Sequence, residues 1–347
     1  MILKNQILSV EKFIQLALYD KKYGYYTKKN SFGKSGDFIT SPLISKLFSE
    51  MISIWIISFW IKLGKPKKFS LVELGPGDGE FCKVLIDVVK KFPEFNKSLK
   101  IYLFENSTSL IQVQKKRLKR KKISWIKNFD EIQTGPVLFF GNEFLDAIPI
   151  KQFKKKGNII YERFLSFKNG KFIKEIFKKV DPKTFKKIKY WNLNNKKIIE
   201  YPEMGFKVLE SICKIIKKNK GGILLIDYGY TSSRGMDTLQ SLKRHKRNDL
   251  FESVGKADIT HLVDFSLLKR FFKMKNLFSN KIVTQSFFLK KLGIIERAEI
   301  LNKNSLFTEK SDMYYRLERL LSDKKMGELF KVIYASNSKN IFSLGFQ

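Results

Sequence analysis

The chain has 347 residues, a length that predicts two domains or one domain with large insertions. Its hydrophobic share of 43% is enough for a packed core and excludes a disordered tail or a solvated fibre. Lys and Arg number 68 against 33 Asp and Glu, which gives a net charge of +35, a balance typical of nucleic-acid-binding proteins. Only 10 of the basic residues are Arg, the side chain best suited to phosphate, so the composition favours coding drift over selected basicity.

Cysteine usage and the start of the chain predict a soluble protein of the cytoplasm. Two Cys and two His are too few for a disulfide framework or a closed zinc site, so we expect no metal. The longest uncharged run, residues 51–61, is shorter than the roughly 20 residues that cross a bilayer. The opening segment MILKNQILSVEK has neither the apolar core of a signal peptide nor the Arg-rich character of a transit sequence.

The first 65 residues read as a helical extension with a candidate lid. Apolar residues at helical spacing predict an amphipathic helix over residues 10–18. A Gly-rich segment follows at residues 31–42, and its GDFITSP part, residues 36–42, is a candidate lid over a ligand. Residues 52–63 form a helical pattern that is apolar nearly all round, which predicts a buried helix.

Residues 66–347 alternate between short apolar runs and helical stretches. The expected strands are 69–74, 101–104, 123–126 and 137–140, and the expected helices between them are 81–90 and 110–121. This alternation predicts βαβ units and a doubly wound, mostly parallel sheet, hence an α/β fold. The core is expected to continue with helices at 203–218 and 267–273 and with strands at 223–226, 281–285 and 330–335.

Two insertions interrupt this core. Residues 151–200 contain short apolar runs with Asn169-Gly170 as a hairpin turn signal, which predicts an inserted β-meander. Residues 228–263 are polar with few periodic apolar positions, which predicts a long loop or lid.

A Gly-rich turn after the first core strand is the strongest local signal for a ligand. In LVELGPGDGE, residues 71–80, glycines at a strand-to-helix turn let the backbone approach a ligand closely. The spacing is G-x-G-x-G and differs from the dinucleotide fingerprint, and Glu73 puts negative charge where a pyrophosphate would lie. A cationic ligand such as S-adenosylmethionine fits better; the alternative is an ordinary Gly-rich connection. The cofactor candidates here are Glu73, Gly75, Pro76, Gly77 and Gly79.

Polar residues also follow two other core strands. Glu105 ends the strand 101–104, where an acid can bind both ribose hydroxyls, although it could equally cap the next helix. Asn142 and Glu143 follow the strand 137–140 at the same carboxyl edge, where ligands of open α/β sheets bind. Asn142 is a candidate for holding the cofactor. Glu143 can orient the acceptor or simply accept backbone N–H bonds.

Several longer segments, in order along nearly the whole chain, resemble the MidA-type methyltransferases. That family includes the mitochondrial complex I assembly factor that symmetrically dimethylates a protein arginine. The matching segments are YGYY at 23–26, GDFITSP at 36–42, ELGPG at 73–77, NEFLDAIP at 142–149, IDYG at 226–229, DITH at 258–261, VDF at 263–265 and TQSFFL at 284–289. The resemblance implies a Rossmann-like class I methyltransferase core, S-adenosylmethionine as cofactor and a protein arginine as acceptor.

A guanidinium keeps its proton at any physiological pH, so carboxylates must bind and orient it. The candidates are Asp37, Glu143 and Asp146, and the residues expected to line the lid or acceptor pocket are Phe38, Thr40, Ser41, Tyr228 and His261. Tyr228 can also be a packing residue and His261 a structural one. The family usually has Glu after Ser41-Pro42, whereas this chain has Leu43. If that Glu helps to hold a guanidinium, this chain lacks the contact.

Two other functions compete with methylation of a protein. Net charge and the Lys-rich insertion, with Tyr161, Phe164 and Phe167, are compatible with nucleic-acid methylation. A binding or assembly protein could also keep the methyltransferase fold without turnover. The run KKRLKRKK at 115–122 is expected to be a solvated helix face. We predict a protein substrate and no nucleic-acid partner.

Overall fold

The chain divides into two compact units, each described here by itself. The computed structural model describes residues 3, 5–27, 40–118, 123–193, 195–232, 235–243 and 246–347. The first unit comprises Met1–Phe38, Leu145–Leu209 and Thr231–Leu267, and the second comprises Ile39–Phe144, Glu210–Tyr230 and Leu268–Gln347. None of the helices in these described stretches is both long and apolar enough to cross a membrane.

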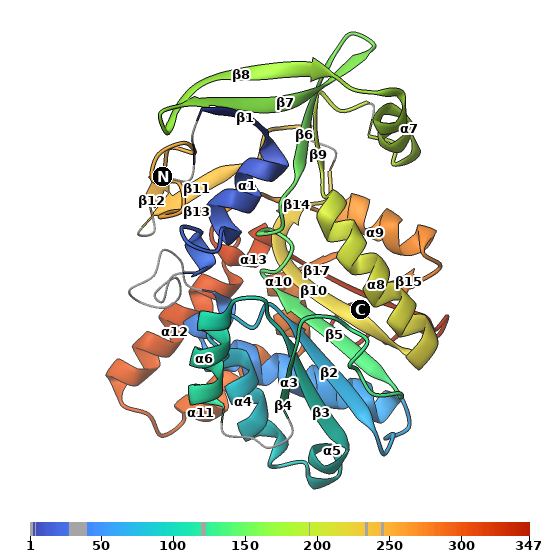
Figure 1. The fold of residues 1–347 in the computed structure, drawn as a ribbon. Coiled ribbons are helices and arrows are strands. Elements are labelled where there is room, and N and C mark those ends of the chain that lie inside the picture. The colour runs from blue at the N-terminus through green and yellow to red at the C-terminus, as the bar shows by residue number, and fades with distance from the viewer. Residues whose placement is uncertain are drawn as a thin grey trace. The chain divides into compact units, whose positions relative to one another are not determined.

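The second unit is built on a mostly parallel sheet. Its strands follow the order β15-β17-β10-β5-β2-β3-β4, and Figure 1 shows the central ones side by side. The parallel strands are β2 (Phe69–Leu74), β3 (Leu99–Phe104), β4 (Ile123–Ile126), β5 (Val137–Asn142) and β10 (Gly221–Tyr230). Antiparallel strands complete the sheet: β17 (Phe330–Ser336), β15 (Phe278–Ser279) and β16 (Val283–Thr284). The predicted doubly wound α/β core is therefore confirmed.

Continuous burial explains why β2 reads as an apolar run rather than as an alternating pattern. Every residue of β2 is buried, as expected where helices cover both faces of a parallel sheet. The predicted buried helix is α3 (Lys46–Lys62), whose Trp55 and Phe59 pack edge-on against Tyr334 of β17, with ring centroids 5.2 and 5.6 Å away. Aromatic packing of this kind fastens α3 to the sheet.

The other helices of this unit include the two predicted at 81–90 and 110–121, each beginning within two residues of its expected start, and several that the apolar periodicity did not predict. They are α2 (Ser41–Ile44), α4 (Glu80–Val89), α5 (Pro93–Ser98), α6 (Thr108–Arg117), α10 (Gln285–Lys291), α11 (Ile294–Asn302), α12 (Phe307–Leu321) and α13 (Met326–Leu329). Helix α6 ends at Arg117, earlier than the predicted helix 110–121, and residues 119–122 lie outside the described part of the chain. Helices α8 (Glu203–Asn219) and α9 (Phe265–Met274) include the positions at which the chain changes unit.

The first unit contains an antiparallel sheet with the strand order β1-β7-β6-β9, and β8 also pairs with β7. Its elements are β1 (Gln6–Ser9), α1 (Val10–Tyr19), the 3-10 helix η1 (Tyr25–Thr27), β6 (Lys151–Lys156), β7 (Ile159–Lys168), β8 (Lys171–Lys179), α7 (Pro182–Tyr190), β9 (Ile198–Tyr201) and β14 (Val263–Asp264). Asn169 and Gly170, both at positive φ, form the turn of the long β7–β8 hairpin visible in Figure 1. The predicted β-meander is present.

Two features of this unit differ from the sequence-based expectation. Strand β1 pairs with β7, so the residues before 39 belong to the same unit as the inserted β-meander. Helix α3 instead packs on the core sheet of the second unit. The expected boundary between an N-terminal extension and the core, at residue 65, therefore differs from the boundary between the two units at residue 39. The predicted long loop at 228–263 contains a small antiparallel sheet of β11 (Gln240–Lys243), β12 (Lys246–Asn248) and β13 (Asp258–Thr260). Its strands have only three or four residues each, too few to show an apolar period.

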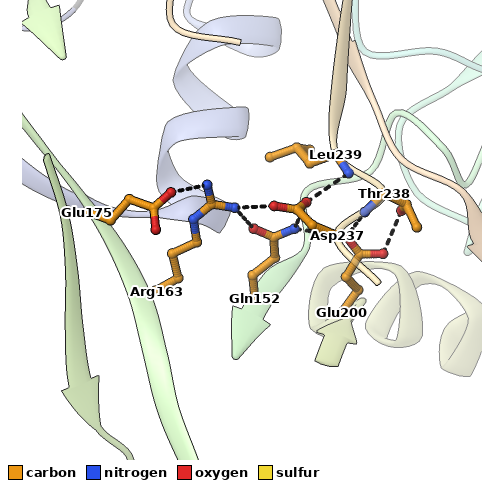
Figure 2. A network of polar contacts seen from close by, with 7 residues as sticks. All are labelled: Gln152, Arg163, Glu175, Glu200, Asp237, Thr238 and Leu239. Carbon is orange, nitrogen blue, oxygen red and sulfur yellow. Dashed lines mark hydrogen bonds and ion pairs between the residues drawn. The ribbon is translucent and has the colours of Figure 1, made fainter. Parts of the chain in front are cut away.

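A polar network joins the strands of the larger sheet to residues 237–239 (Figure 2). Arg163 on β7 donates to Gln152 of β6 over 2.6 Å and to Asp237 over 2.7 Å, and it forms an ion pair with Glu175 of β8 at 2.6 Å. Glu200 of β9 accepts hydrogen bonds from Gln152 and from Thr238. The Arg163 side chain is only 13% exposed, whereas Glu175 and Asp237 are 39% and 38% exposed, so water partly screens these charged hydrogen bonds.

Candidate active site

Three strands of the second unit end at one edge of its sheet. Leu74 of β2 pairs with Phe104 of β3 and with Gly141 of β5, so the segments that follow these strands emerge together. The N–H of Gly75 donates to the carbonyl of Phe104 over 3.1 Å. The glycine turn, Glu105 and Asn142 therefore lie at the carboxyl edge of a parallel sheet, the usual ligand position in this architecture.

The glycine turn needs glycine at three positions. Gly75, Gly77 and Gly79 have φ values of +63°, +54° and +84°, a left-handed region that strains any residue with a Cβ. A Cβ on Gly75 would also lie 3.2 Å from the Phe144 ring. The turn closes through a 2.8 Å hydrogen bond from Gly79 N–H to the carbonyl of Pro76, and α4 begins directly after it. The backbone is thus shaped for close approach by a ligand.

Glu73 is a buried carboxylate for which the described residues offer no compensating cation. It is 5% exposed, and its Oε2 has no hydrogen-bond partner in the described part of the chain. Burial, reinforced by the negative charges of Asp78 and Glu105, raises the pKa of Glu73 to about 8. A buried acid of this kind fits a ligand that brings positive charge, because a cation would offset the cost of ionising it.

Glu105 is oriented by two donors. Its Oε1 accepts a hydrogen bond from the N–H of Ser107 over 2.8 Å, and its Oε2 is 3.4 Å from Nε2 of Gln114. Burial raises the pKa of Glu105, and these hydrogen bonds partly offset that rise. The cap of α6 is Ser107, whose hydroxyl accepts from Leu110 N–H, so Glu105 does not itself cap that helix.

Asn142 and Glu143 connect the end of β5 to the start of α2. Glu143 adopts a φ of +53°, uncommon outside glycine, and its N–H donates to the Ile226 carbonyl over 2.9 Å. Its Oε1 accepts hydrogen bonds from Asn142 Nδ2 at 3.0 Å and from Ser41 N–H at 3.1 Å. Oδ1 of Asn142 is buried and has no partner among the described residues, so a ligand donor can use it.

The start of α2 carries the lid candidates that the structure describes. Thr40 is the N-cap of α2, with no side-chain capping bond, and Ser41 is the first helical residue. The Ser41 hydroxyl donates to Oε1 of the buried Gln285 over 3.3 Å. Asp37 and Phe38 lie outside the described residues.

The remaining predicted site residues have packing or structural contacts. The Tyr228 ring packs against Phe330, with centroids 5.3 Å apart. Asp146 and His261 belong to the first unit, where the His261 N–H donates to the Asp146 carbonyl over 3.3 Å. His261 is 5% exposed, its Nε2 lies 3.1 Å from the Ile148 carbonyl, and burial lowers its pKa. These contacts favour a structural role for His261.

Sequence reasoning missed two residues of α6 that contact the glycine turn. Gln114 donates to the Gly77 carbonyl over 2.7 Å, and Arg117 forms ion pairs with Asp78 at 2.7 Å and with Glu80 at 2.8 Å. Arg117 and the buried Leu118 fall in the basic run 115–122, so at these two positions the run is not a solvated face. A hydrophobic period cannot reveal such contacts, because Gln and Arg count as polar positions wherever they point.

Comparison with known proteins gives the class. Residues 51–283 match Methyltransf_28, a family model described as S-adenosyl-L-methionine-dependent methyltransferase. The chain belongs to this family: it is a class I S-adenosylmethionine-dependent methyltransferase, and S-adenosylmethionine is its cofactor. The resemblance to MidA-type enzymes is thereby confirmed.

Curated relatives are similar over most of both chains. "Protein arginine methyltransferase NDUFAF7 homolog, mitochondrial" of Caenorhabditis elegans is 33% identical over 79% of this chain and 70% of its own length. "Protein arginine methyltransferase NDUFAF7, mitochondrial" of Danio rerio is 28% identical over 96% of this chain and 84% of its own. The Homo sapiens protein of that name is also 28% identical, over 93% of this chain and 78% of its own.

A solved structure shares the fold. It is a COG1565 superfamily member from Burkholderia thailandensis bound to S-adenosyl-homocysteine, with a TM-score of 0.80 and 21% identity, covering 98% of this chain and 89% of that one. The expectation of a cytoplasmic protein is contradicted, because the curated relatives are named as mitochondrial proteins.

Proposed function

We propose that the chain transfers methyl groups from S-adenosylmethionine to the guanidinium of a protein arginine. The observation that carries the acceptor is the similarity to proteins named as protein arginine methyltransferases along 93–96% of this chain. Neither nucleic-acid methylation nor binding without turnover finds support in these comparisons.

The cofactor is proposed to bind at the glycine turn of the second unit. Glu73 would face its positive charge, the turn Gly75–Gly79 would let it approach the backbone, and Glu105 would bind the ribose. The unpaired Oε2 of Glu73 and Oδ1 of Asn142 support this placement, since both are buried and lack partners in the described chain. When bound, S-adenosylmethionine supplies an electrophilic methyl group on its sulfonium; the related Burkholderia structure was solved with S-adenosyl-homocysteine.

The protein's part in catalysis is to bind and align the acceptor. A guanidinium stays protonated, so carboxylates must hold it and direct one nitrogen toward the methyl group. Asp37, Glu143 and Asp146 are the proposed carboxylates. Oε1 of Glu143 accepts a hydrogen bond from Ser41 N–H, which fixes the position of its carboxylate at the edge of the sheet.

The decisive experiment follows labelled methyl groups. Purified protein is incubated with methyl-labelled S-adenosylmethionine and a cell lysate, and label is measured separately in protein and in RNA, followed by hydrolysis to identify methylarginine. Label in methylarginine supports the proposal. Label in RNA would favour nucleic-acid methylation, and cofactor binding without label would favour a binding protein.

A single charge change tests the acceptor side. Asp37→Asn keeps the side-chain shape and removes the charge, so it should leave cofactor affinity within a few-fold and reduce methyl transfer by about 10²-fold. Transfer at the wild-type rate would remove Asp37 from the proposed carboxylates and leave Glu143 and Asp146.

A further inference from the structure

Gln114 is a fully buried polar side chain that contacts three different elements around the glycine turn. It is 0% exposed and lies on α6, one turn after the buried Leu110. Its Nε2 donates to the carbonyl of Gly77 over 2.7 Å and lies 3.4 Å from Oε2 of Glu105. Its Oε1 accepts a 2.8 Å hydrogen bond from the indole N–H of Trp125 on β4.

The Trp125 contact determines which way the Gln114 amide points. An indole N–H can only donate, so the atom facing it must be the amide oxygen. The amide nitrogen is then directed at Gly77 and Glu105, where both neighbours are acceptors. One side chain therefore orients the turn that follows β2 and the acid that follows β3.

Helix α6 contacts the glycine turn through a second side chain, Arg117. Arg117, three residues after Gln114 and so on the same side of α6, pairs with Asp78 at 2.7 Å and with Glu80 at 2.8 Å. The side chains of Gln114 and Leu118 also line Gly79, where an added Cβ would meet them at 3.5 and 3.4 Å. Helix α6 thus orders the turn in the protein before any ligand arrives.

We propose that Gln114 is a positioning residue that sets the affinity of the enzyme for the nucleoside half of its cofactor. This inference rests on the proposed placement of the ribose on Glu105. Fixing the carboxylate in advance removes the cost of ordering it on binding, which strengthens its hydrogen bonds to the ribose hydroxyls. Gln114 acts through Gly77 and Glu105.

The test compares S-adenosylhomocysteine with its 2′-deoxy analogue by titration calorimetry. Wild-type protein should prefer the ribose form by at least about tenfold, the usual size of a hydrogen bond to a charged group. Gln114→Met, similar in volume, should weaken binding of S-adenosylhomocysteine about tenfold and reduce that preference to a few-fold. The KM for S-adenosylmethionine should rise with kcat little changed. Gln112→Met, exposed on the same helix, is the matched control.

Trp125→Phe is a second variant: it keeps an aromatic ring but removes the N–H that orients the Gln114 amide. It should weaken binding of S-adenosylhomocysteine and reduce the ribose preference in the same direction as Gln114→Met, but by less. The inference is overturned if a folded Gln114→Met protein prefers S-adenosylhomocysteine over its 2′-deoxy analogue by a ratio within twofold of the wild-type ratio. It is also overturned if the affinities for both ligands fall equally, as a merely structural role predicts. A wild type without any ribose preference also overturns it. Methyl transfer to arginine is measured in a separate experiment, and its absence would contradict the proposed acceptor. The preference for S-adenosylhomocysteine over its 2′-deoxy analogue would still decide the role of Gln114.

Discussion

Ser41 donates its backbone N–H to Oε1 of Glu143 over 3.1 Å, which joins the first turn of α2 to the residue that follows β5. Ser41, in the described part of the candidate lid segment, therefore contacts one of the proposed catalytic carboxylates. A change at Glu143 acts both on the charge available to an acceptor and on the anchoring of α2.

Two variants separate these roles of Glu143. Glu143→Gln keeps an acceptor for Ser41 N–H and removes the charge, so methyl transfer should fall by about 10²-fold while affinity for S-adenosylhomocysteine changes only a few-fold. Glu143→Ala should also lower the thermal midpoint, because it removes the acceptor as well. Initial rates, calorimetry and thermal unfolding are the measurements, with the exposed Glu131→Gln as control. An active Glu143→Gln enzyme would assign Glu143 to anchoring alone.

Gly77→Val should abolish cofactor binding with little loss of fold. Gly77 sits at a φ of +54° in the turn, where a side chain would both strain the backbone and occupy the place of close approach. Gly157→Val is the matched control, since Gly157 has a φ of +56° and nothing within 4 Å of an added Cβ. Calorimetric titration of both variants checks this; a folded Gly77→Val protein with wild-type affinity would place the cofactor elsewhere.

Affinity for S-adenosylmethionine should rise with pH because of Glu73. Its pKa is raised to about 8, so below that pH the ligand-free side chain holds a proton that a cationic ligand must displace. The association constant should increase by up to about tenfold per pH unit and level off above about pH 8.

Without ligand, the free energy of unfolding should fall as pH rises from the ordinary pKa of 4.5 toward 8, because the folded state binds this proton more tightly.

Glu73→Gln should remove the pH dependence of cofactor affinity and that of the free energy of unfolding. Titrations at several pH values compare wild type, Glu73→Gln and Glu131→Gln, and the control accounts for titration of the ligand itself. Parallel curves for all three proteins would show that Glu73 does not sense the cofactor's charge.

Arg163→Met should destabilise the first unit. Its removal leaves Asp237 and Glu175 without their shared cation and Gln152 Oε1 without its donor (Figure 2). We expect a loss of about 2 kcal/mol and a thermal midpoint lower by several degrees. Arg247→Met, at an exposed position of β12, should change the midpoint by less than about 1 °C, within the small range of ordinary surface substitutions. Equal midpoints for the two variants would contradict the assigned strength of this network.

Leu43→Glu tests the residue at which this chain departs from its family. Leu43 is the third residue of α2, near the helix N-terminus, where a Glu is favoured by the helix dipole and adds a carboxylate. Methylarginine formation should increase a few-fold over wild type, measured with the labelled lysate; Leu43→Gln, which adds no charge, is the control. No gain from Leu43→Glu would show that the family's Glu is dispensable here.

The sequence by itself determined the parallel sheet, the glycine turn after β2 and the acids that follow β2 and β3. These features are local: buried strands read as apolar runs, positive φ requires glycine, and residues after consecutive parallel strands emerge at one edge. Longer motifs added the family, since segments such as GDFITSP and NEFLDAIP are specific in themselves.

Only the tertiary structure decided which distant residues meet. Pairing of β1 with β7 joins residues far apart in the chain, and nothing in either strand specifies the other. Gln114 and Arg117 read as ordinary polar helix residues until α6 is placed beside the turn, where their side chains hold Gly77 and Asp78. The physical reason is that hydrogen bonds and ion pairs depend on positions in space, whereas a sequence pattern records only spacing along the chain.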